Sequence, residues 1–317
     1  MRYTPPAWLK GGHAQTIWPL LIKGERPRFS RRRWQTPDDD FIDIDFLPPQ
    51  PDQPIVILFH GLEGSSRSHY ARSLMRELTA RRWNGAVVHF RGCSGEPNRR
   101  PRAYHSGDAA EIDWILRRFA HRFPDVPRYA MGVSLGGNAL LCWLGTRQEE
   151  SARLISRAAA VSAPLDLAAS GHSLAEGFNR VYTRYFLHTM RRAAADKARR
   201  FPGSFDAAAA SRARTLAEFD DAYTAPLHGF ANADEYWHRA SAKPLLRTIR
   251  IPTLVLNARN DPFLPESALP EPDEVAPCVR LEQPEEGGHV GFVSGPFPGT
   301  LDWMPKRVLH YFDSYEA

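Results

Sequence analysis

Residues 129–138 constrain the fold of this 317-residue chain more than any other stretch. They read YAMGVSLGGN: a short apolar run, the pattern Gly-x-Ser-x-Gly, and the start of an apolar helix. A turn this tight crowds the positions two residues before and two residues after the serine, so Gly132 and Gly136 are needed as glycines. The turn strains the backbone at Ser134 and exposes its hydroxyl at the end of a strand. We therefore predict a strand, a sharp turn and a helix, with Ser134 as a nucleophile.

Apolar runs with the length of buried strands alternate with segments that have helical spacing. This alternation is typical of a mostly parallel α/β sheet flanked by helices. Asp43 and Asp45 alternate with apolar residues, which predicts a half-exposed antiparallel pair of strands at residues 32–35 and 41–47. The other predicted strands cover residues 55–59, 86–90, 129–133, 158–162, 252–257 and 278–282, and the predicted helices cover residues 65–82, 107–123, 138–144 and 301–315.

The segment 168–248 interrupts the alternation of strands and helices. It has helical patterns at residues 178–198, 211–223 and 233–240 but no convincing strand. We therefore predict one α/β domain over residues 1–317, with a helical cap inserted at residues 168–248. Residues 1–30 are rich in proline and glycine and predict an irregular arm with one short helix. Aromatic residues at helical spacing in the first cap helix favour core packing over substrate lining; they are Phe178, Tyr182, Tyr185 and Phe186.

A nucleophilic serine needs a general base, and His289 is the best placed of the twelve histidines. It lies in the glycine-flanked loop GGHVGF, beyond the last predicted strand. Asp261 follows the strand at 252–257 and is placed to orient the imidazole and to fix its tautomer. Asp166, which follows the preceding strand, is the rival acid. Ser134, Asp261 and His289 also occur along the chain in the order expected for a nucleophile on such an elbow.

An oxyanion formed at Ser134 needs two backbone N–H donors. Leu135 supplies one, because it follows the nucleophile at the N-terminus of a helix, where the helix dipole favours negative charge. The second donor is expected in the loop after the strand at 55–59, most simply at Leu62. His60 in the same loop is interpreted as a structural residue that holds the loop.

Composition and charge exclude several classes of protein. The chain is 43% hydrophobic and 24% charged, as is usual for a globular protein. Its net charge of +5 comes from arginines spread along the whole chain, so no nucleic-acid partner is expected. Three cysteines without a secretory leader argue against a disulfide framework and fit the cytoplasm. No apolar stretch has the length of a transmembrane helix, although peripheral membrane contact stays open, and nothing indicates an oligomeric state.

The sequence lacks the usual patterns for bound cofactors. No cluster of cysteine, histidine and acidic residues has convincing zinc spacing. Neither a phosphate-binding loop nor a dinucleotide-binding glycine pattern is present. We expect no metal and no organic cofactor.

With these residues considered, the chain resembles the α/β-hydrolases, and within them the YheT-like branch. That branch is related to the membrane-associated mammalian α/β-hydrolases and to the plant embryogenesis-associated hydrolases. The resemblance covers nearly the whole chain and rests on residues 11–16 (GGHAQT), 60–65 (HGLEGS), 91–95 (RGCSG), 104–108 (YHSGD), 132–138 (GVSLGGN), 260–262 (NDP) and 287–292 (GGHVGF). It implies an α/β-hydrolase fold and places the family's charge-relay residues on Ser134, Asp261 and His289.

The resemblance also implies hydrolysis of carboxylic esters, with lipid esters as substrates in some relatives. The residues and the resemblance together predict a serine hydrolase that acts on a small-molecule ester or a lipid through an acyl-serine intermediate. Two alternatives use the same three residues: an acyltransferase, in which an alcohol or thiol replaces water, and a phospholipid or thioester hydrolase. A ligand-binding protein without catalysis would be expected to lack part of this set.

Overall fold

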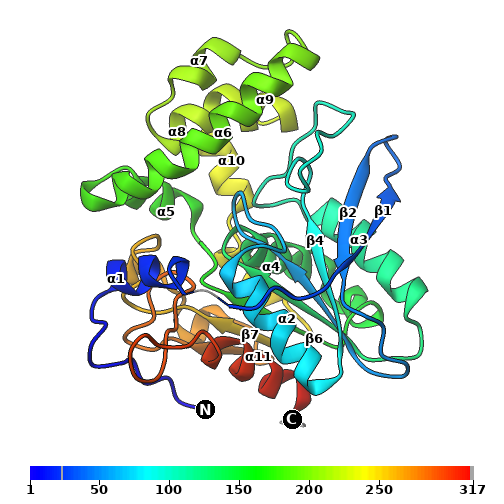
Figure 1. Ribbon diagram of the computed structural model, residues 1–317. Coiled ribbons are helices and arrows are strands. Elements are labelled where there is room, and N and C mark those ends of the chain that lie inside the picture. The colour runs from blue at the N-terminus through cyan, green and yellow to red at the C-terminus, as the bar shows by residue number, and fades with distance from the viewer. Residues whose placement is uncertain (23, 315–317) are drawn as a thin grey trace.

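A computed structural model describes residues 1–22 and 24–314 of the chain. Its strands are β1 (Ser30–Gln35), β2 (Phe41–Phe46), β3 (Ile55–Phe59), β4 (Asn84–His89), β5 (Arg128–Val133), β6 (Arg157–Val161), β7 (Thr253–Leu256) and β8 (Val279–Glu282). They form an eight-stranded sheet in the order β1-β2-β4-β3-β5-β6-β7-β8. Figure 1 shows where this sheet lies in the molecule. β2 pairs antiparallel with β1 and with β4, and all other neighbours pair in parallel. The predicted mostly parallel sheet is confirmed.

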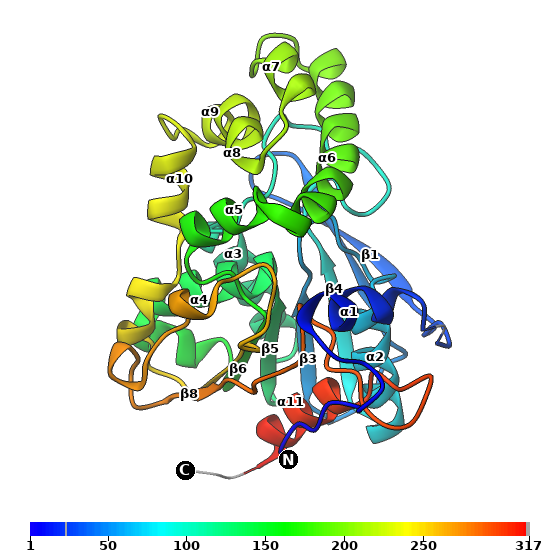
Figure 2. The same cartoon turned by 90° about the vertical axis from the view of Figure 1, so that its left-hand side faces the viewer.

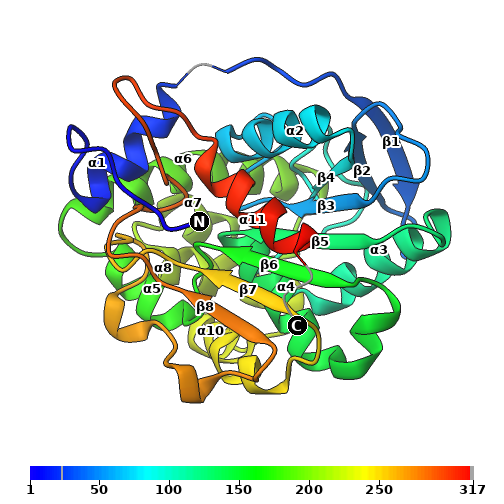
Figure 3. The same cartoon turned by 90° about the horizontal axis from the view of Figure 1, so that it is seen from below.

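Helices cover both faces of this sheet, as Figure 3 shows. α2 (His69–Arg81) and α11 (Trp303–Asp313) pack on one face, and α3 (Ala109–Arg122) and α4 (Leu135–Arg147) pack on the other. Successive residues of β3 therefore enter opposite cores, with Ile57 on the α3 and α4 side and Leu58 on the α2 and α11 side. All five residues of β3 are fully buried, which explains its uninterrupted apolar sequence.

The predicted helices that flank the sheet are found within a few residues of their expected ends. The predicted segment 107–123 forms α3. At the N-terminus of this helix, the side chain of Asp108 accepts a hydrogen bond from the backbone N–H of Glu111. The helix predicted at 138–144 forms the middle of α4. The helix predicted at 301–315 is described from Trp303 to Asp313, and residue 315 lies outside the described part of the chain. Within that described part, no helix is both long enough and apolar enough to cross a membrane.

The prediction that β2 is half exposed is wrong. Asp43 and Asp45 are buried although they alternate with apolar residues. Arg33 and Arg31 of the neighbouring strand β1 each donate two hydrogen bonds to these carboxylates, at 2.7–2.9 Å. Burial is the largest single effect and raises the pKa of Asp43, but the hydrogen bonds and positive charges of its neighbours, those of Arg33 foremost, together outweigh burial and lower the pKa. Sequence periodicity cannot distinguish a carboxylate in water from one covered by arginines.

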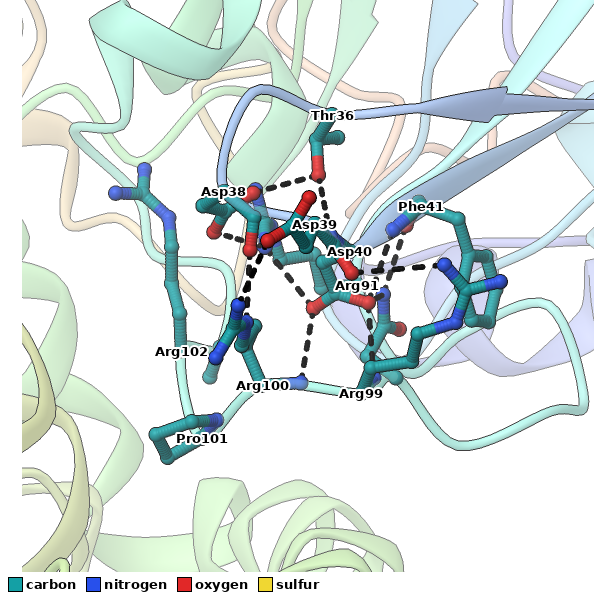
Figure 4. A network of polar contacts seen from close by, with 12 residues as sticks. Thr36, Asp38, Asp39, Asp40, Phe41, Arg91, Arg99, Arg100, Pro101 and Arg102 are labelled. Atoms are coloured by element: carbon teal, nitrogen blue, oxygen red, sulfur yellow. Dashed lines mark hydrogen bonds and ion pairs between the residues drawn. The ribbon is translucent and has the colours of Figure 1, made fainter.

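A buried carboxylate also fixes the long connection between β4 and α3. Asp40, at the turn before β2, is fully buried and accepts hydrogen bonds from four residues of the segment 91–102. Arg91 donates at 3.0 Å, the Asn98 amide at 2.9 Å, and the backbone N–H groups of Arg99 and Arg100 at 2.9 and 3.3 Å; Figure 4 shows this network. The sequence RGCSGE at 91–96 therefore begins a long loop that is pinned by these hydrogen bonds.

Residues between β6 and β7 form a group of helices that lies beyond one end of the sheet, as Figures 1 and 2 show. Its α-helices are α5 (Leu167–Leu174), α6 (Arg180–Arg200), α7 (Ala207–Arg212), α8 (Leu216–Phe219), α9 (Ala225–His228) and α10 (Ala233–Ala240). α10 coincides with the predicted helix at 233–240. The single helix predicted at 211–223 is wrong, because α7 ends at Arg212 and a new helix begins after Thr215, whose side chain accepts from the N–H of Glu218.

The N-terminal arm contains the short helix that its sequence predicts. This helix is α1 (Gly12–Ile17), and a turn of 3-10 helix, η1 (Trp18–Leu20), follows it. Gln15 and Thr16 are buried within α1. Figure 2 shows α1 on the same side of the molecule as α6.

Candidate active site

The residues before and after Ser134 form a very tight strand-to-helix turn. Ser134 has φ 53° and ψ −124° between the end of β5 and the start of α4. A Cβ atom at Gly132 would lie 2.4 Å from the carbonyl oxygen of Gly136. A Cβ atom at Gly136 would lie 2.4 Å from the carbonyl oxygens of Phe59 and His60. Both positions therefore require glycine. At Gly132 the reason is the crowding within the turn that the sequence suggests, whereas at Gly136 it is the close approach of the end of β3.

The structure brings Ser134, His289 and Asp261 together from three separate loops. Nε2 of His289 lies 3.0 Å from Oγ of Ser134, and Nδ1 of His289 lies 2.9 Å from Oδ2 of Asp261. The other carboxylate oxygen of Asp261 accepts the backbone N–H of Phe263 at 2.8 Å. Since the carboxylate faces Nδ1, that nitrogen carries the proton and Nε2 is free to accept one from the serine.

Packing holds the imidazole of His289 in this orientation. The ring of Phe263 stacks on it with centroids 4.0 Å apart and planes tilted by 22°. Next to the histidine, the N–H of Val290 donates to Oγ of Ser162 at 3.0 Å. The Asp261 side chain is 1% exposed, so water does not compete with the imidazole for it.

Helix α1 supports the loop that carries His289, a role that the sequence did not reveal. Thr16 accepts the backbone N–H of His289 at 2.9 Å through its hydroxyl oxygen. The Oε1 atom of the fully buried Gln15 accepts from the backbone N–H of Gly287 at 2.8 Å and from the Asn260 amide at 3.0 Å. A single polar side chain thus connects the loops that carry the histidine and the aspartate. The only sequence signal for this role was the GGHAQT pattern at residues 11–16. It does not reveal the contacts of Gln15 and Thr16, because the residues that they contact lie about 250 positions further along the chain.

The backbone N–H groups of Leu62 and Leu135, both near Ser134, have no acceptor among the described residues. The neighbours of Leu62 are all engaged. The N–H of Gly61 donates to the Tyr70 hydroxyl at 2.8 Å, that of Glu63 to the Tyr104 hydroxyl at 2.9 Å, and that of Gly64 to the Gly61 carbonyl at 3.0 Å. Both free N–H groups belong to residues that line the same cavity as Ser134.

His60 has the contacts of a structural residue. Its Nδ1 lies 2.7 Å from the Gly61 carbonyl oxygen, and its Nε2 accepts the backbone N–H of Phe90 at 3.1 Å. Complete burial lowers the pKa of His60 to about 3, so the ring is neutral at physiological pH. Both nitrogens are therefore occupied in holding the loop that presents Leu62.

A cavity of about 330 Å³ opens at Ser134 and His289. Leu62 and Leu135 line it beside the two reactive side chains, and the pinned loop after β4 contributes Cys93 and Asn98. The helices between β6 and β7 supply a mainly apolar wall, formed by Leu167, Leu174, Phe186, Met190, Leu216, Phe219, Tyr223 and Trp237. Apolar walls with few polar groups are typical of sites for small, mostly apolar ligands.

Other sequence interpretations have mixed outcomes. The rival acid Asp166 instead accepts the N–H of Ala169 at the start of α5 and does not contact His289. Of the four aromatic residues at the start of α6, Tyr182 is buried and Phe186 lines the cavity. Phe178 and Tyr185 are 53% and 68% exposed, so the prediction that they pack in the core is wrong for these two residues.

Comparisons with known proteins agree with the observed fold. The alpha/beta hydrolase fold family matches residues 54–296. "Putative esterase YheT" of Escherichia coli K12 is 38% identical over 99% of this chain and 93% of its own length. "Phospholipase ABHD3" of Homo sapiens is 28% identical over 98% of this chain and 78% of its own length. The solved Pyrococcus furiosus esterase Pf2001 shares the fold, with a TM-score of 0.59 at 16% identity over 90% of each chain. The chain therefore belongs to the alpha/beta hydrolase fold family, in its YheT-like branch.

Proposed function

We propose that this protein is a serine hydrolase that cleaves carboxylic esters, with Ser134 as nucleophile, His289 as general base and Asp261 as the orienting acid. The observation that carries the proposal is the continuous pair of hydrogen bonds from Asp261 through His289 to Ser134, at 2.9 and 3.0 Å. The relatives named esterase and phospholipase support the same reaction type.

In the first half of the reaction, Nε2 of His289 takes the proton of the Ser134 hydroxyl while Oγ attacks the ester carbonyl carbon. The imidazolium is stabilised by the buried Asp261 carboxylate. Collapse of the tetrahedral intermediate expels the alcohol, which receives the proton from His289, and leaves an acyl-serine. Water then attacks this acyl group with His289 again as base, which releases the acid and restores the serine.

The tetrahedral intermediate carries a negative oxygen that needs hydrogen-bond donors. We assign the backbone N–H groups of Leu62 and Leu135 to this role, since both lack an acceptor among the described residues and both residues line the cavity. Leu135 is also the first residue of α4, where the helix dipole favours negative charge. One such donor contributes about 10²–10³-fold to turnover in serine hydrolases.

Residues 168–248 act, in this proposal, as a cap that selects the acyl chain. The apolar cavity wall contributed by this segment supports that role. A hydrocarbon chain bound there would lose contact with water, worth about 0.8 kcal/mol for each buried CH₂ group. Esters of fatty acids, including lipids, are thus the substrates that fit the cavity. All three cysteines are free thiols, in keeping with the cytoplasmic location that we also propose.

The experiment that tests the proposal is turnover of a p-nitrophenyl ester by Ser134→Ala. We expect a loss of at least about 10⁴-fold in kcat with an unchanged melting temperature. Ser30→Ala, at an exposed serine of β1, is the matched control and should keep full activity. A fluorophosphonate probe should label the wild type and not Ser134→Ala. Activity or labelling that survives in Ser134→Ala contradicts the proposal, and transfer of the acyl group to added alcohol in preference to water would identify an acyltransferase instead.

A further inference from the structure

A hollow on the outer side of α6 is surrounded by cationic side chains. Its lining contains no acidic residue within the described part of the chain and consists of Arg180, Arg184, Leu187, His188, Arg191, Ser211, Arg212 and Arg214. α6 contributes Arg180, Arg184 and Arg191, and the end of α7 and the residues after it contribute Arg212 and Arg214. Two segments of the chain thus bring five guanidinium groups to one place.

The arginines of this hollow differ from other arginines of the chain. Arg31, Arg33 and Arg91 are all in ion pairs with carboxylates. Across residues 1–22 and 24–314, none of the five arginines in the hollow pairs with an acidic side chain. The Nε atom of Arg191 is hidden from solvent and has no acceptor among those residues, although its Nη2 donates to the Ala213 carbonyl. These donors are available to an anion.

Large apolar side chains lie next to the hollow on the same helix. Val181 and Tyr185, each one position after an arginine of the hollow, are 49% and 68% exposed. One residue along an α-helix is a rotation of about 100°, so these two side chains form a stripe directly beside the arginine stripe. Phe178, before the first turn of α6, is 53% exposed.

Helix α1 lies on the same side of the molecule as α6 in Figure 2 and contacts the start of α6. The ring of His13 lies 4.6 Å from that of Phe178, and its Nδ1 lies 3.1 Å from the Tyr182 hydroxyl. Beyond His13, α1 and the following turn expose Ile17, Leu20 and Leu21, with Leu20 67% and Leu21 64% exposed. We define the α1–α6 face as Ile17, Leu20, Leu21, Phe178, Val181 and Tyr185.

We infer that the α1–α6 face and the arginine hollow bind together to an anionic phospholipid bilayer. The guanidinium groups take the phosphate groups of the lipids, and the exposed apolar side chains enter the outer part of the acyl layer. A second copy of the chain fits this surface less well, because a two-fold contact would bring the unpaired arginines of the two copies toward each other. The bilayer would then lie beside α6, whose opposite side lines the cavity through Phe186 and Met190.

This inference does not depend on the chemistry assigned to Ser134, and vesicle co-sedimentation tests it. We expect the full chain to sediment with vesicles of phosphatidylcholine and phosphatidylglycerol at 0.15 M salt and to remain in solution with phosphatidylcholine alone. Arg180→Glu, Arg184→Glu and Arg212→Glu combined should weaken partitioning by about tenfold or more. Leu20→Ser, Leu21→Ser and Tyr185→Ser combined should weaken it similarly, because the inserted apolar area is lost.

The matched control reverses the same number of charges elsewhere, with Arg118→Glu, Arg122→Glu and Arg153→Glu, and should bind vesicles like the wild type. Turnover of a short, soluble ester verifies that every variant is folded. Failure of the wild type to bind anionic vesicles overturns the inference, as does equal weakening by the control. A dimer in solution that the Leu20, Leu21 and Tyr185 substitutions dissociate, without vesicle binding, would identify the face as a contact between copies and also overturn it.

Discussion

The hydroxyl of Thr16 accepts the backbone N–H of His289 at 2.9 Å, although 273 residues separate them. The backbone of the proposed base is therefore positioned by an N-terminal helix that lies outside the family match at residues 54–296. Gln15, one residue earlier, fixes Gly287 in the same loop. Because a small displacement of a catalytic imidazole lowers turnover strongly, α1 should matter for kcat as well as for stability.

Thr16→Val tests this positioning role. The variant keeps the shape of the side chain but removes the acceptor for the His289 N–H, and we expect kcat to fall about tenfold with little change in KM. Thr16→Ser restores the acceptor and should restore most of the activity. Steady-state kinetics with a short p-nitrophenyl ester, together with melting temperatures, separates displacement of His289 from unfolding. Wild-type kcat in Thr16→Val would refute the role.

Asp261→Asn tests the assignment of the acid. The amide still offers an oxygen to the N–H of Phe263, but it favours the wrong tautomer of His289, so kcat should fall about 10⁴-fold while the fold is kept. Asp166→Asn is the matched control, because asparagine caps a helix about as well as aspartate and Asp166 does not contact His289. If the losses were reversed between the two variants, the assignment of the acid would be wrong.

The elbow predicts that Gly136 tolerates no side chain. In Gly136→Ala the added Cβ would lie 2.4 Å from the carbonyl oxygens of Phe59 and His60, both held in the sheet or its loop. We expect the free energy of unfolding to fall by about 3 kcal/mol and activity to be lost. Gly203→Ala is the control: its φ is 79°, but no heavy atom lies within 4 Å, so it should cost about 1 kcal/mol and leave activity intact. Urea unfolding and ester turnover measure both variants.

Asp220 makes stability depend on pH. Burial raises its pKa from 3.8 to about 6, despite hydrogen bonds from Thr224 and Trp237. The unfolded chain ionises this group near pH 4, whereas the folded protein keeps it protonated up to about pH 6. Its contribution to folding therefore becomes less favourable as the pH rises from 4 to 6, by about 3 kcal/mol in total.

Asp220→Asn should remove this dependence, because the amide accepts from Trp237 and does not ionise. The difference in melting temperature between the variant and the wild type should increase in favour of the variant from pH 4.5 to pH 8. Buried histidines such as His60 also make the melting temperature depend on pH, but they do so equally in the variant and in the wild type. Their effect therefore cancels in the difference between the two melting temperatures. A difference that does not change with pH would show that Asp220 titrates normally.

Met190→Trp tests whether α6 limits the acyl chain. Met190 is half-buried, packs beside the cap helices and lines the cavity. A larger side chain there would shorten the apolar space, so the preferred p-nitrophenyl ester should shift to a shorter chain while turnover of the acetate ester stays within about twofold. A chain-length series measures the shift. An unchanged preference would mean that the acyl group binds elsewhere in the cavity.

Features that depend on neighbours a few residues apart were predictable from the sequence. The need for glycine at position 132 follows from the sterics of one turn, and the strands and helices follow from hydrophobic spacing. Helix α10 was predicted at its observed bounds, residues 233–240. The break at residues 213–215 was not predicted, because an apolar pattern continued across it and a local capping bond competed successfully with the helix.

The sequence by itself determined the sheet with its helices and a short set of candidate residues: Ser134, His289 and Asp261, with Asp166 as the rival acid. Only the tertiary structure decided that Asp261 is the carboxylate that reaches His289, that Asp43 and Asp45 are buried against arginines, and that α1 supports the histidine loop. The reason is physical. Spacing along a chain reports steric and hydrophobic preferences over one or two turns, whereas these contacts depend on how segments up to 273 residues apart pack together.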